Sequence, residues 1–366
     1  MLFSGEEICQ VRLMTPKGIE LDLDVENAMR TPDYAECAVR KYSGDDPDVT
    51  DGLLIYAKVE KQEEASSGLR VILDGGVGVG RVTKPGLEQK IGQAAINKVP
   101  RKMITEEVER ICRAAASDVY KRQVISIPEG EEAAKKTFNP RLGIVGGLSV
   151  LGTSGIVEPM SEKALTDTIY LEMKMLRESG YSFCYAVPGN YGMDFLTGEL
   201  GIDPDLAVKC SNYVGDTIDD AKLLGMKGLL LIGHAGKFIK LAAGIMNTHS
   251  RTADCRMEVF ASHAAMAGAD AAAVKEIMAC LNTAEAVKIL KGKGLLPDVM
   301  KTVMERIAFY LRQRAGGELE TGAVVFSGEE GILGRTENAE RLLGLIESQR
   351  KKRGSEVPGQ QEIQKQ

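Results

Sequence analysis

The pattern of apolar and polar positions changes near residue 140, and the two halves of the chain predict different architectures. Before this point, short apolar stretches are separated by turns. Residues 19–23 alternate between apolar and polar side chains, as a half-buried strand does, and residues 11–14 precede them across a Pro-Lys-Gly turn. Residues 53–59 and 69–73 predict another pair of strands. We therefore expect an α+β domain over residues 1–138.

After residue 140, short buried strands alternate with amphipathic helices. The predicted strands lie at residues 142–145, 183–187, 208–214 and 228–232. One helix begins after Ser161, a favourable N-cap, and ends at Gly180. Alternation of strands and helices at this spacing predicts a parallel, doubly wound sheet. We therefore expect a Rossmann-like α/β domain over residues 139–320, ending in alanine-rich helices.

The C-terminal part of the chain predicts one more strand and then a polar tail. Residues 321–326 form an apolar run, and we expect residues 321–348 to be a strand and a helix that pack back onto the second domain. Residues 349–366 are rich in Lys, Arg and Gln and offer no apolar core positions, so they predict a disordered tail.

One short segment is foreign to the surrounding pattern. Residues 117–123 read Ser-Asp-Val-Tyr-Lys-Arg-Gln, the heptapeptide that one frame of a transposase end sequence used in DNA library preparation encodes. We hypothesise that it is an assembly artefact, and we assign it no function.

Composition and charge exclude several classes of protein. Hydrophobic residues make up 44% and charged residues 27% of the chain, a globular balance, and every long apolar run is interrupted before it could span a bilayer. The net charge of −6 argues against nucleic acid as a partner, because phosphate neutralisation needs a basic face. The seven cysteines form no C-x-x-C pair, which is typical of reduced thiols in a cytoplasm. We expect a cytoplasmic protein with a small-molecule substrate, and we leave a homo-oligomer open.

Glycine-rich runs are the first candidates for a binding site. Residues 142–155 carry five glycines after a predicted strand, where backbone can approach a ligand closely, although the spacing is not G-x-G-x-x-G and a tight turn without ligand is the alternative. Residues 74–87 could form an anion-binding nest or a hairpin tip. Residues 233–240 place a glycine turn and two lysines at a predicted helix N-terminus, which favours an anion over simple solvation of the lysines.

Two polar runs are further candidates. Residues 247–256 combine Thr, His, Ser, Asp and Arg, which suits an anionic substrate, while a helix-capping loop is the alternative. Residues 44–50 carry three aspartates that could bind a hard cation, but an Asp-Pro turn is the better interpretation. The three histidines lack zinc-site spacing and no G-x-S-x-G motif occurs, so we predict neither a protein-bound metal nor a hydrolase triad.

Seven runs, taken in order along residues 10–343, resemble one family: the cobalt-precorrin-5B C1-methyltransferases of anaerobic cobalamin biosynthesis. The matching runs are SGDDPDVT (43–50), RVTKPGL (81–87), AINKVPRKMI (95–104), TFNPRLGIVGG (137–147), PGNYG (188–192), GHAGK (233–237) and THSR (248–251). The resemblance implies methyl transfer from S-adenosylmethionine to C1 of a cobalt-containing tetrapyrrole, giving cobalt-precorrin-6A. It also implies an α+β domain followed by a Rossmann-like one.

The resemblance and the chemistry of the runs together suggest roles for individual residues. Cations and glycine-turn amides suit the acetate and propionate side chains of the tetrapyrrole. If the reaction needs a base, the candidates are His249 or one of Asp45, Asp46 and Asp48, with Asp46 and Asp48 preferred among the aspartates. Predicted cofactor-binding residues are Gly143, Gly146, Gly147, Thr153, Gly155, Gly189 and Asn190. Predicted substrate-binding residues are Thr83, Lys84, Asn97, Arg101, Gly233, His234, Lys237, Lys240, Thr248, Ser250 and Arg251.

The resemblance also carries a departure and leaves two alternatives. The family begins with a Thr-Thr-Gly-rich segment that contains Cys-Ala-Ala, whereas Met1 falls inside the first strand region. We therefore expect a first domain that is truncated relative to the family, and loss of activity if the site needs that segment. The alternatives are a nucleotide- or NAD-binding oxidoreductase on a Rossmann-like sheet and a non-catalytic tetrapyrrole-binding protein.

Overall fold

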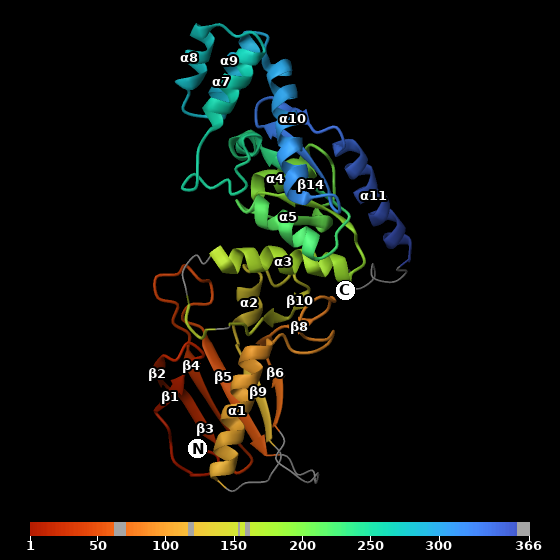
Figure 1. Ribbon diagram of the computed structural model, residues 1–366. Helices are drawn as coiled ribbons and strands as arrows, with labels where there is room; N and C mark the ends of the chain where they lie inside the picture. Colours follow the sequence, from red (N-terminus) through yellow and green to blue (C-terminus); the bar gives the residue numbers. More distant parts are fainter. Residues whose placement is uncertain (62–70, 116–120, 153, 158–161, 357–366) are drawn as a thin grey trace. The chain divides into compact units, whose positions relative to one another are not determined.

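The computed structural model describes residues 1–61, 71–115, 121–152, 154–157 and 162–356 (Figure 1). The chain forms two compact units, unit 1 (Met1–Ser161) and unit 2 (Glu162–Gln366). The sequence pattern placed the change of domain after residue 138 instead. Residues 139–161 belong with unit 1 because two of their strands pair with earlier strands of that unit.

Unit 1 is built on a five-stranded mixed sheet in the order β3-β4-β5-β9-β6. All neighbours are antiparallel except β6 and β9. Its strands are β1 (Gln10–Met14), β2 (Glu20–Asp24), β3 (Glu26–Arg30), β4 (Tyr34–Arg40), β5 (Leu54–Lys61), β6 (Val71–Gly75), β7 (Gly78–Val79), β8 (Arg81–Val82), β9 (Lys121–Ser126), β10 (Ile144–Val145) and β11 (Gly147–Leu148). Its helices are α1 (Lys98–Ala114) and α2 (Gly130–Ala134).

Strand pairing in unit 1 both confirms and corrects the sequence predictions. The hairpin of β1 and β2 forms as predicted. The strands predicted at 53–59 and 69–73 also form, as β5 and β6, but they do not pair with each other, because β9 lies between them. β9 begins at Lys121, so the last residues of the apparently foreign heptapeptide lie in a central strand, and the side chain of Gln123 is buried there. Residues 116–120 lie outside the described part of the chain.

Close contacts between glycines join β7, β11 and the start of α2 in unit 1. β11 pairs in parallel with β7, and a Cβ added at Gly147 would lie 2.2 Å from the carbonyl oxygen of Gly78. A Cβ added at Gly130 would meet the same oxygen at 2.2 Å. Three backbone segments therefore approach one another more closely than side chains would allow. The apolar core beneath them consists of Leu73, Val79, Ala94, Ile96, Ile125, Ile127, Ala134 and Leu148.

Unit 2 has a sheet in the order β13-β12-β14-β15-β16, in which only β16 is antiparallel to its neighbour. Its strands are β12 (Phe183–Val187), β13 (Ala207–Lys209), β14 (Gly228–His234), β15 (Glu320–Ser327) and β16 (Gly331–Arg335). Its helices are α3 (Glu162–Glu178), α4 (Asn190–Gly198), α5 (Val214–Leu223), α6 (Ala235–Phe238), α7 (Arg256–Met266), α8 (Ala271–Met278), α9 (Thr283–Gly292), α10 (Leu296–Ala315) and α11 (Ala339–Glu356), with 3-10 helices η1 (Pro204–Leu206) and η2 (Ile239–Ala243).

Helices cover both faces of the sheet in unit 2. Alternate residues of β12 point to opposite faces: Cys184 and Ala186 join the core formed with α3, α5 and α10, whereas Tyr185 and Val187 join the core formed with α4 and α11. This alternation explains why β12 reads as a continuous apolar run. A mixed α/β architecture is thus confirmed. β16 and its antiparallel pairing had no counterpart in the sequence prediction.

The predicted disorder from Gln349 onward is wrong for residues 349–356, which belong to α11. The side-chain oxygen of Gln349 accepts hydrogen bonds from the backbone N–H groups of Ser182 (3.0 Å) and Phe183 (3.2 Å). Arg350 forms ion pairs with Asp203 and Glu347. Polar contacts with the sheet, which leave no apolar signature, therefore extend the helix past the predicted end. Residues 357–366 lie outside the described residues.

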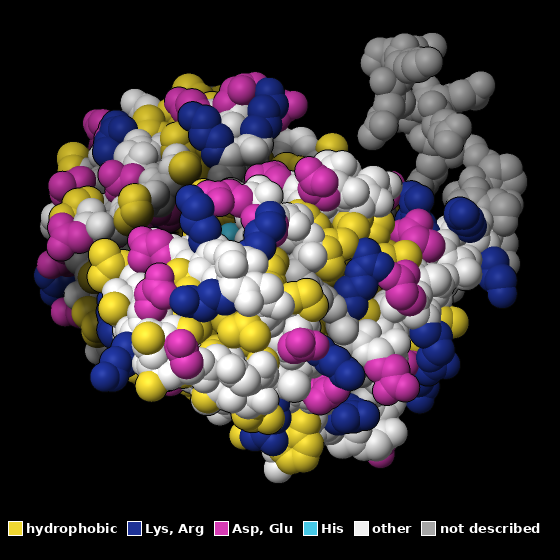
Figure 2. Space-filling view, turned by 90° about the horizontal axis from the view of Figure 1, so that it is seen from above, with side chains coloured by type: hydrophobic (Ala, Val, Ile, Leu, Met, Phe, Trp, Pro, Cys, Tyr) yellow, Lys and Arg dark blue, Asp and Glu magenta, His cyan; other side chains and the backbone are white. Residues whose placement is uncertain are grey.

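The face of the molecule that Figure 2 shows is mixed in charge. On the face of the molecule in Figure 2, lysine and arginine side chains alternate with aspartate and glutamate side chains, and no large patch carries a single sign. Within the described residues, no helix combines the length and apolarity needed to cross a membrane.

Candidate functional site

The carboxyl edge of the parallel strands in unit 2 contains a topological switch point. After β12 the chain enters α4 on one face of the sheet, and after β14 it enters α6 on the other face. β12 and β14 are neighbours, so their connections diverge. Open α/β sheets bind ligands at such places. Residues 188–191 and 233–237, called the switch point below, include several residues predicted from the sequence.

Gly189 and Asn190 form one side of the switch point. Gly189 has φ = 103° and a Cβ added there would meet nothing within 4 Å, so the glycine serves the turn and leaves open space beside the backbone. α4 begins at Asn190 without a side-chain cap. The Nζ of Lys209, at the end of β13, donates to Oδ1 of Asn190 at 3.0 Å. An uncapped helix start beside a lysine is suited to an anionic group.

His234 and Gly233 form the other side. Nδ1 of His234 accepts a hydrogen bond from the N–H of Gly236 at 3.1 Å, which caps α6. Burial lowers the pKa of His234, so the ring is neutral at pH 7 with its proton on Nε2. Gly233 is buried, and a Cβ there would lie 2.5 Å from the ring of Phe238. Packing against Phe238 therefore explains why this position is a glycine.

Lys237 reaches across the switch point. Its Nζ donates to the carbonyl oxygen of Pro188 at 3.3 Å, so it joins the connections after β12 and β14. Burial lowers the pKa of Lys237, and the neighbouring Lys240 lowers it further. No carboxylate in the described residues forms an ion pair with Lys237, which leaves its charge available to an anionic ligand.

Lys240 was predicted to bind substrate, but the structure corrects this prediction. Its side chain is 3% exposed, and its Nζ donates to the carbonyl oxygens of Thr248 (3.2 Å) and Ala253 (2.8 Å). The ammonium group thus holds the loop of residues 247–253 from inside. Such a buried cation is satisfied by carbonyls and has no access to a ligand.

The loop of residues 247–253 presents some of its predicted residues to solvent and holds others. Thr248 is buried, and its hydroxyl donates to Oδ1 of Asn212 at 3.3 Å. His249, Ser250 and Arg251 are exposed. Nδ1 of His249 accepts the N–H of Arg251 at 3.0 Å, which places the ring proton on Nε2. The loop is therefore both a structural turn and a polar surface.

The sequence predicted that the glycine run of residues 142–155 follows a strand of the parallel sheet. The structure contradicts this prediction. β10 pairs antiparallel with β8 inside unit 1. Gly143 and Gly147 are required by packing, because a Cβ at Gly143 would lie 2.5 Å from Cγ of Lys84. Gly146, with φ = 82°, and Gly155, with φ = 73°, are exposed turn positions. Thr153 lies outside the described residues.

Four predicted substrate residues also lie in unit 1. The hydroxyl of Thr83 donates to the carbonyl oxygen of Gly143 at 2.7 Å, and Lys84 is exposed beside it. Asn97 precedes α1 and makes no side-chain cap bond. Arg101 donates to the carbonyl oxygen of Leu73 at 3.1 Å, which engages part of its guanidinium within the fold. The structure thus brings Thr83 and Lys84 together at the start of the glycine run.

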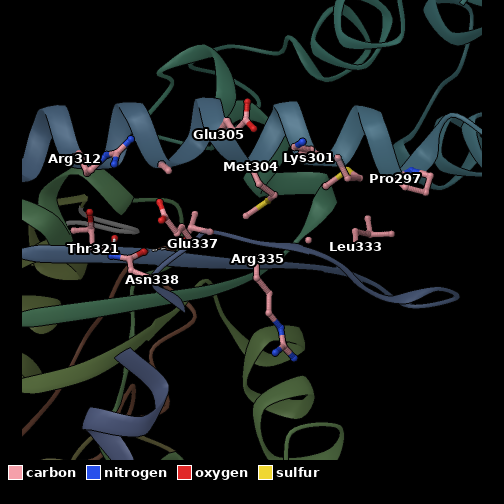
Figure 3. A pocket seen from close by; sticks show the side chains of 14 residues that line it. Pro297, Lys301, Met304, Glu305, Arg312, Thr321, Leu333, Arg335, Glu337 and Asn338 are labelled. Atoms are coloured by element: carbon pink, nitrogen blue, oxygen red, sulfur yellow. Dashed lines mark hydrogen bonds between the residues drawn. The ribbon is translucent and has the colours of Figure 1, made fainter. Parts of the chain in front are cut away.

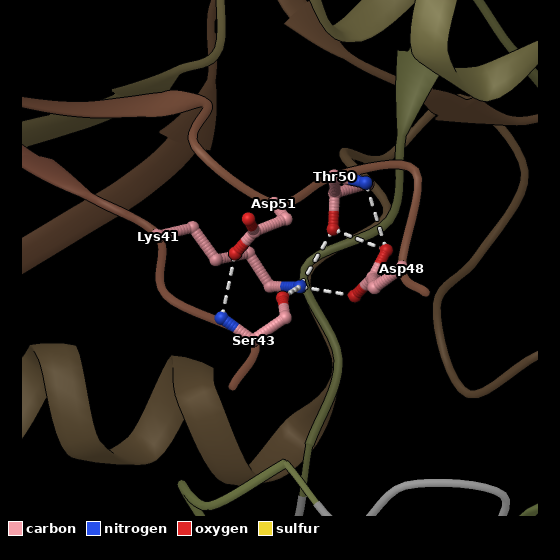
Figure 4. A network of polar contacts seen from close by, with 5 residues as sticks. All are labelled: Lys41, Ser43, Asp48, Thr50 and Asp51. Carbon is pink, nitrogen blue, oxygen red and sulfur yellow. Dashed lines mark hydrogen bonds and ion pairs between the residues drawn. The ribbon is translucent and has the colours of Figure 1, made fainter. Parts of the chain in front are cut away.

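Of the aspartates in residues 44–50, Asp48 belongs to a structural network with Lys41, Ser43, Thr50 and Asp51 (Figure 4). Lys41 pairs with Asp48, and its Nζ also donates to Thr50 (2.6 Å) and Ser43 (3.0 Å). Partial burial raises the pKa of Asp48, but hydrogen bonds from Lys41 and Thr50 outweigh it, so this pKa lies below its usual value. A carboxylate held in this way is a weak base. Asp46 contributes its backbone carbonyl to the same turn, accepting the N–H of Asp48 at 2.7 Å.

Comparison with known proteins identifies the family. The family profile described as CbiD matches residues 1–159, and the profile described as CbiD, C-terminal domain, matches residues 247–337. A cobalt-precorrin-5B C(1)-methyltransferase from Ruminiclostridium cellulolyticum is 48% identical over 89% of this chain and 84% of its own length. This chain belongs to the CbiD family. A second relative of the same name, from Alkaliphilus metalliredigens, is 40% identical over 95% of this chain and 90% of its own.

A solved CbiD-family structure, described as a cobalamin biosynthesis protein from Archaeoglobus fulgidus, is also similar to this chain. It shares 25% identity, covers 68% of this chain and 76% of its own, and has a TM-score of 0.34. The resemblance and the enzyme class predicted from the sequence are confirmed by the curated relatives. They do not favour the oxidoreductase or the non-catalytic alternative.

Two residues in or beside the switch point of this CbiD-family chain had no role predicted from the sequence: Tyr191 lies within it, and Lys209 contacts it from β13. Tyr191 is 81% exposed, and its ring centroid lies 6.5 Å from that of His234. Lys209 binds Asn190. Tyr191 belongs to the matched run PGNYG, so the signal was present, but no chemistry was attached to an aromatic ring there.

A separate cavity of about 720 Å³ lies between α10 and β16 of this unit (Figure 3). Met300, Met304 and Leu333 line its apolar part, and Arg312 and Thr321 lie toward its other end. The residues that line the cavity all lie between Pro297 and Asn338, outside residues 188–191 and 233–237. The cavity is therefore distinct from the switch point. No group of three or more His, Cys, Asp or Glu side chains arranged to hold a metal occurs in the part of the chain that the structure describes.

Proposed function

We propose that this CbiD-family chain transfers a methyl group from S-adenosylmethionine to C1 of cobalt-precorrin-5B, giving cobalt-precorrin-6A. The observation that carries the proposal is the 48% identity, over 89% of the chain, to a relative named cobalt-precorrin-5B C(1)-methyltransferase. Methyl transfer from a sulfonium is an in-line displacement, so the protein chiefly has to bind and align donor and acceptor.

We infer that S-adenosylmethionine binds at the switch point and that unit 2 is Rossmann-like in this sense. Gly189 leaves open space beside the backbone, and the uncapped start of α4 suits the carboxylate of the amino-acid moiety. Lys209 and Lys237 place two positive charges beside the same turn. These features support Gly189 and Asn190 as cofactor-binding residues. Gly143, Gly146, Gly147 and Gly155 lose their main support, because packing or a turn explains them.

The substrate is polyanionic, and exposed cations are the groups that would meet it. Lys84 and Arg251 are exposed and keep their charge at the surface, together with Ser250 on the same loop as Arg251. If a proton must leave, we favour His249 over Asp48, because His249 is exposed while Asp48 is held by Lys41 and Thr50. Full turnover by His249→Ala would remove this histidine from the mechanism. We further propose a cytoplasmic location, which the sequence pattern supports, because the seven cysteines form no C-x-x-C pair.

The direct test is turnover by the purified full chain. We expect cobalt-precorrin-5B and S-adenosylmethionine carrying a labelled methyl group to yield S-adenosylhomocysteine and a tetrapyrrole labelled at C1, observed by NMR. Thermal shift provides a second readout: stabilisation by S-adenosylhomocysteine and not by NADH supports the methyltransferase. Stabilisation by NADH, or by tetrapyrrole alone without turnover, would favour one of the two alternatives instead.

A further inference from the structure

The switch point holds two aromatic rings that the proposed function has not used. We propose that Tyr191 and His234 form the subsite for the adenine ring of the cofactor, with Tyr191 as the stacking surface and Nε2 of His234 as the hydrogen-bond donor. This inference rests on the proposed function, because it names the adenine site of the same cofactor. It also reassigns His234, which the sequence analysis gave to the tetrapyrrole.

The tautomer of His234 is fixed by the fold. Its Nδ1 accepts the N–H of Gly236, so the proton of the neutral ring must lie on Nε2. Within the described residues, Nε2 has no hydrogen-bond partner, and it is not among the unpartnered side-chain atoms that are closed off from solvent. Burial keeps the pKa of His234 below its ordinary value, and the ring is neutral near pH 7. An accessible neutral donor with a fixed direction is therefore available to a ligand.

An aromatic row behind His234 holds the ring in place. Phe326 of β15 meets it edge-on, with centroids 5.6 Å apart, and Phe195 of α4 stacks on Phe326 at 3.9 Å. Tyr191 lies on the outer side of the row, tilted by 41° to His234. Its ring is 81% exposed, so most of its surface is free to be covered by a flat ligand. Tyr191 and Phe195 come from α4, which follows β12. His234 ends β14, and Phe326 is its partner on the neighbouring strand β15.

The chemistry of this pair fits adenine better than a carboxylate. A purine offers a flat π face for Tyr191 and ring nitrogens that accept a hydrogen bond. A carboxylate would gain more from Lys209 and Lys237, which lie beside Gly189 on the same edge. The two lysines and the two rings thus lie at the same edge, which offers the two kinds of group that a cofactor with a charged amino-acid end and an aromatic base requires.

The test is isothermal titration of the full chain with S-adenosylhomocysteine, using paired variants. Tyr191→Phe keeps the ring and should bind as the wild type does, whereas Tyr191→Leu should bind about tenfold more weakly, as expected for loss of one stacked base. His234→Asn keeps an acceptor for the N–H of Gly236, but its shorter amide cannot place a donor at the position of Nε2. This variant should bind several-fold more weakly with an unchanged melting temperature. Tyr42→Leu is the matched control, because Tyr42 is similarly exposed, at 83%, and lies in unit 1.

The outcomes separate this inference from the proposed function. If the wild type does not bind S-adenosylhomocysteine, the proposed cofactor is wrong. If the wild type binds and Tyr191→Leu and His234→Asn bind equally well, the cofactor stands and the adenine subsite is wrong. Should His234→Asn unfold, Tyr191→Leu against Tyr191→Phe decides, because Tyr191 is exposed and its replacement leaves the core intact. Adenosine alone, titrated into the same variants, should lose affinity in the same order.

Discussion

Gln349 offers a sharp test of how the C-terminal helix is attached. β12 pairs with β13 only from Tyr185 onward, so the backbone of Phe183 lies beyond the end of β13. The side-chain amide of Gln349 pairs with this backbone in place of a strand. Its oxygen accepts the N–H groups of Ser182 and Phe183, and its nitrogen donates to the carbonyl oxygen of Phe183. We predict that Gln349→Ala loosens this attachment.

The size of the effect follows from the three hydrogen bonds. Each contributes about 1 kcal/mol net, and water can replace part of them because the site is half-buried. We therefore expect Gln349→Ala to destabilise the start of β12 by about 2 kcal/mol. A free-energy change of that size corresponds to an opening equilibrium that increases roughly 30-fold.

Hydrogen exchange of the full chain, read by mass spectrometry, measures this opening locally. Peptides that contain Ser182 and Phe183 should exchange faster in Gln349→Ala by about the factor given above, while peptides from unit 1 should not change. Lys351→Ala is the matched control, because Lys351 is an exposed residue of the same helix. Equal exchange in the wild type and Gln349→Ala would refute the attachment and restore the interpretation of this segment as a tail.

Three further predictions concern packing, a buried cation and pH. Gly147→Ala should lower the free energy of unfolding by about 3 kcal/mol, because its Cβ would lie 2.2 Å from a carbonyl oxygen. Gly146→Ala should lower it by only about 1 kcal/mol, because Gly146 has a positive φ but open space. Unfolding in urea measures both changes. Lys240→Met should increase hydrogen exchange of residues 247–253 about tenfold, whereas Lys237→Met should leave that exchange unchanged and weaken anion binding. Burial, and then nearby carboxylates, raise the pKa of Asp220 from 3.8 to about 6. The stability that the protonated carboxyl provides is therefore lost as pH rises through 6. Asp220→Asn should be more stable than the wild type by about 1 kcal/mol at pH 8 and equally stable near pH 4.

The sequence predicted best those elements whose signal is local. β12 coincides with the predicted residues 183–187, because a fully buried parallel strand is a continuous apolar run bounded by turn residues. Gly189, His234 and Lys237 were predicted as site residues because they follow predicted strands directly, and the structure places them at one edge of the sheet, while their roles stay predictions. Local pattern and topology agree there, so prediction of that part of the site needed no knowledge of distant contacts.

Predictions failed where distant segments decide the structure. Nothing in residues 53–73 indicates that β9, which begins only at Lys121, separates β5 from β6. Likewise, the glycines of residues 143–147 indicate close backbone approach, and the sequence cannot say whether the approaching group is a ligand or another strand. In this chain, the group that approaches Gly147 is the backbone of Gly78, and the group that approaches Gly143 is the side chain of Lys84.

This distinction gives a rule for separating binding glycines from packing glycines in the same chain. Neighbouring atoms fill the position that a Cβ would take at Gly143, Gly147 and Gly233. Substitution of these glycines therefore damages the fold, whatever the protein binds. Gly189 has a positive φ but open space, so the fold alone asks for a turn and leaves the adjoining volume to something else. Because that volume adjoins the uncapped start of α4, a ligand at the switch point accounts for both features together, whereas a turn accounts for only one.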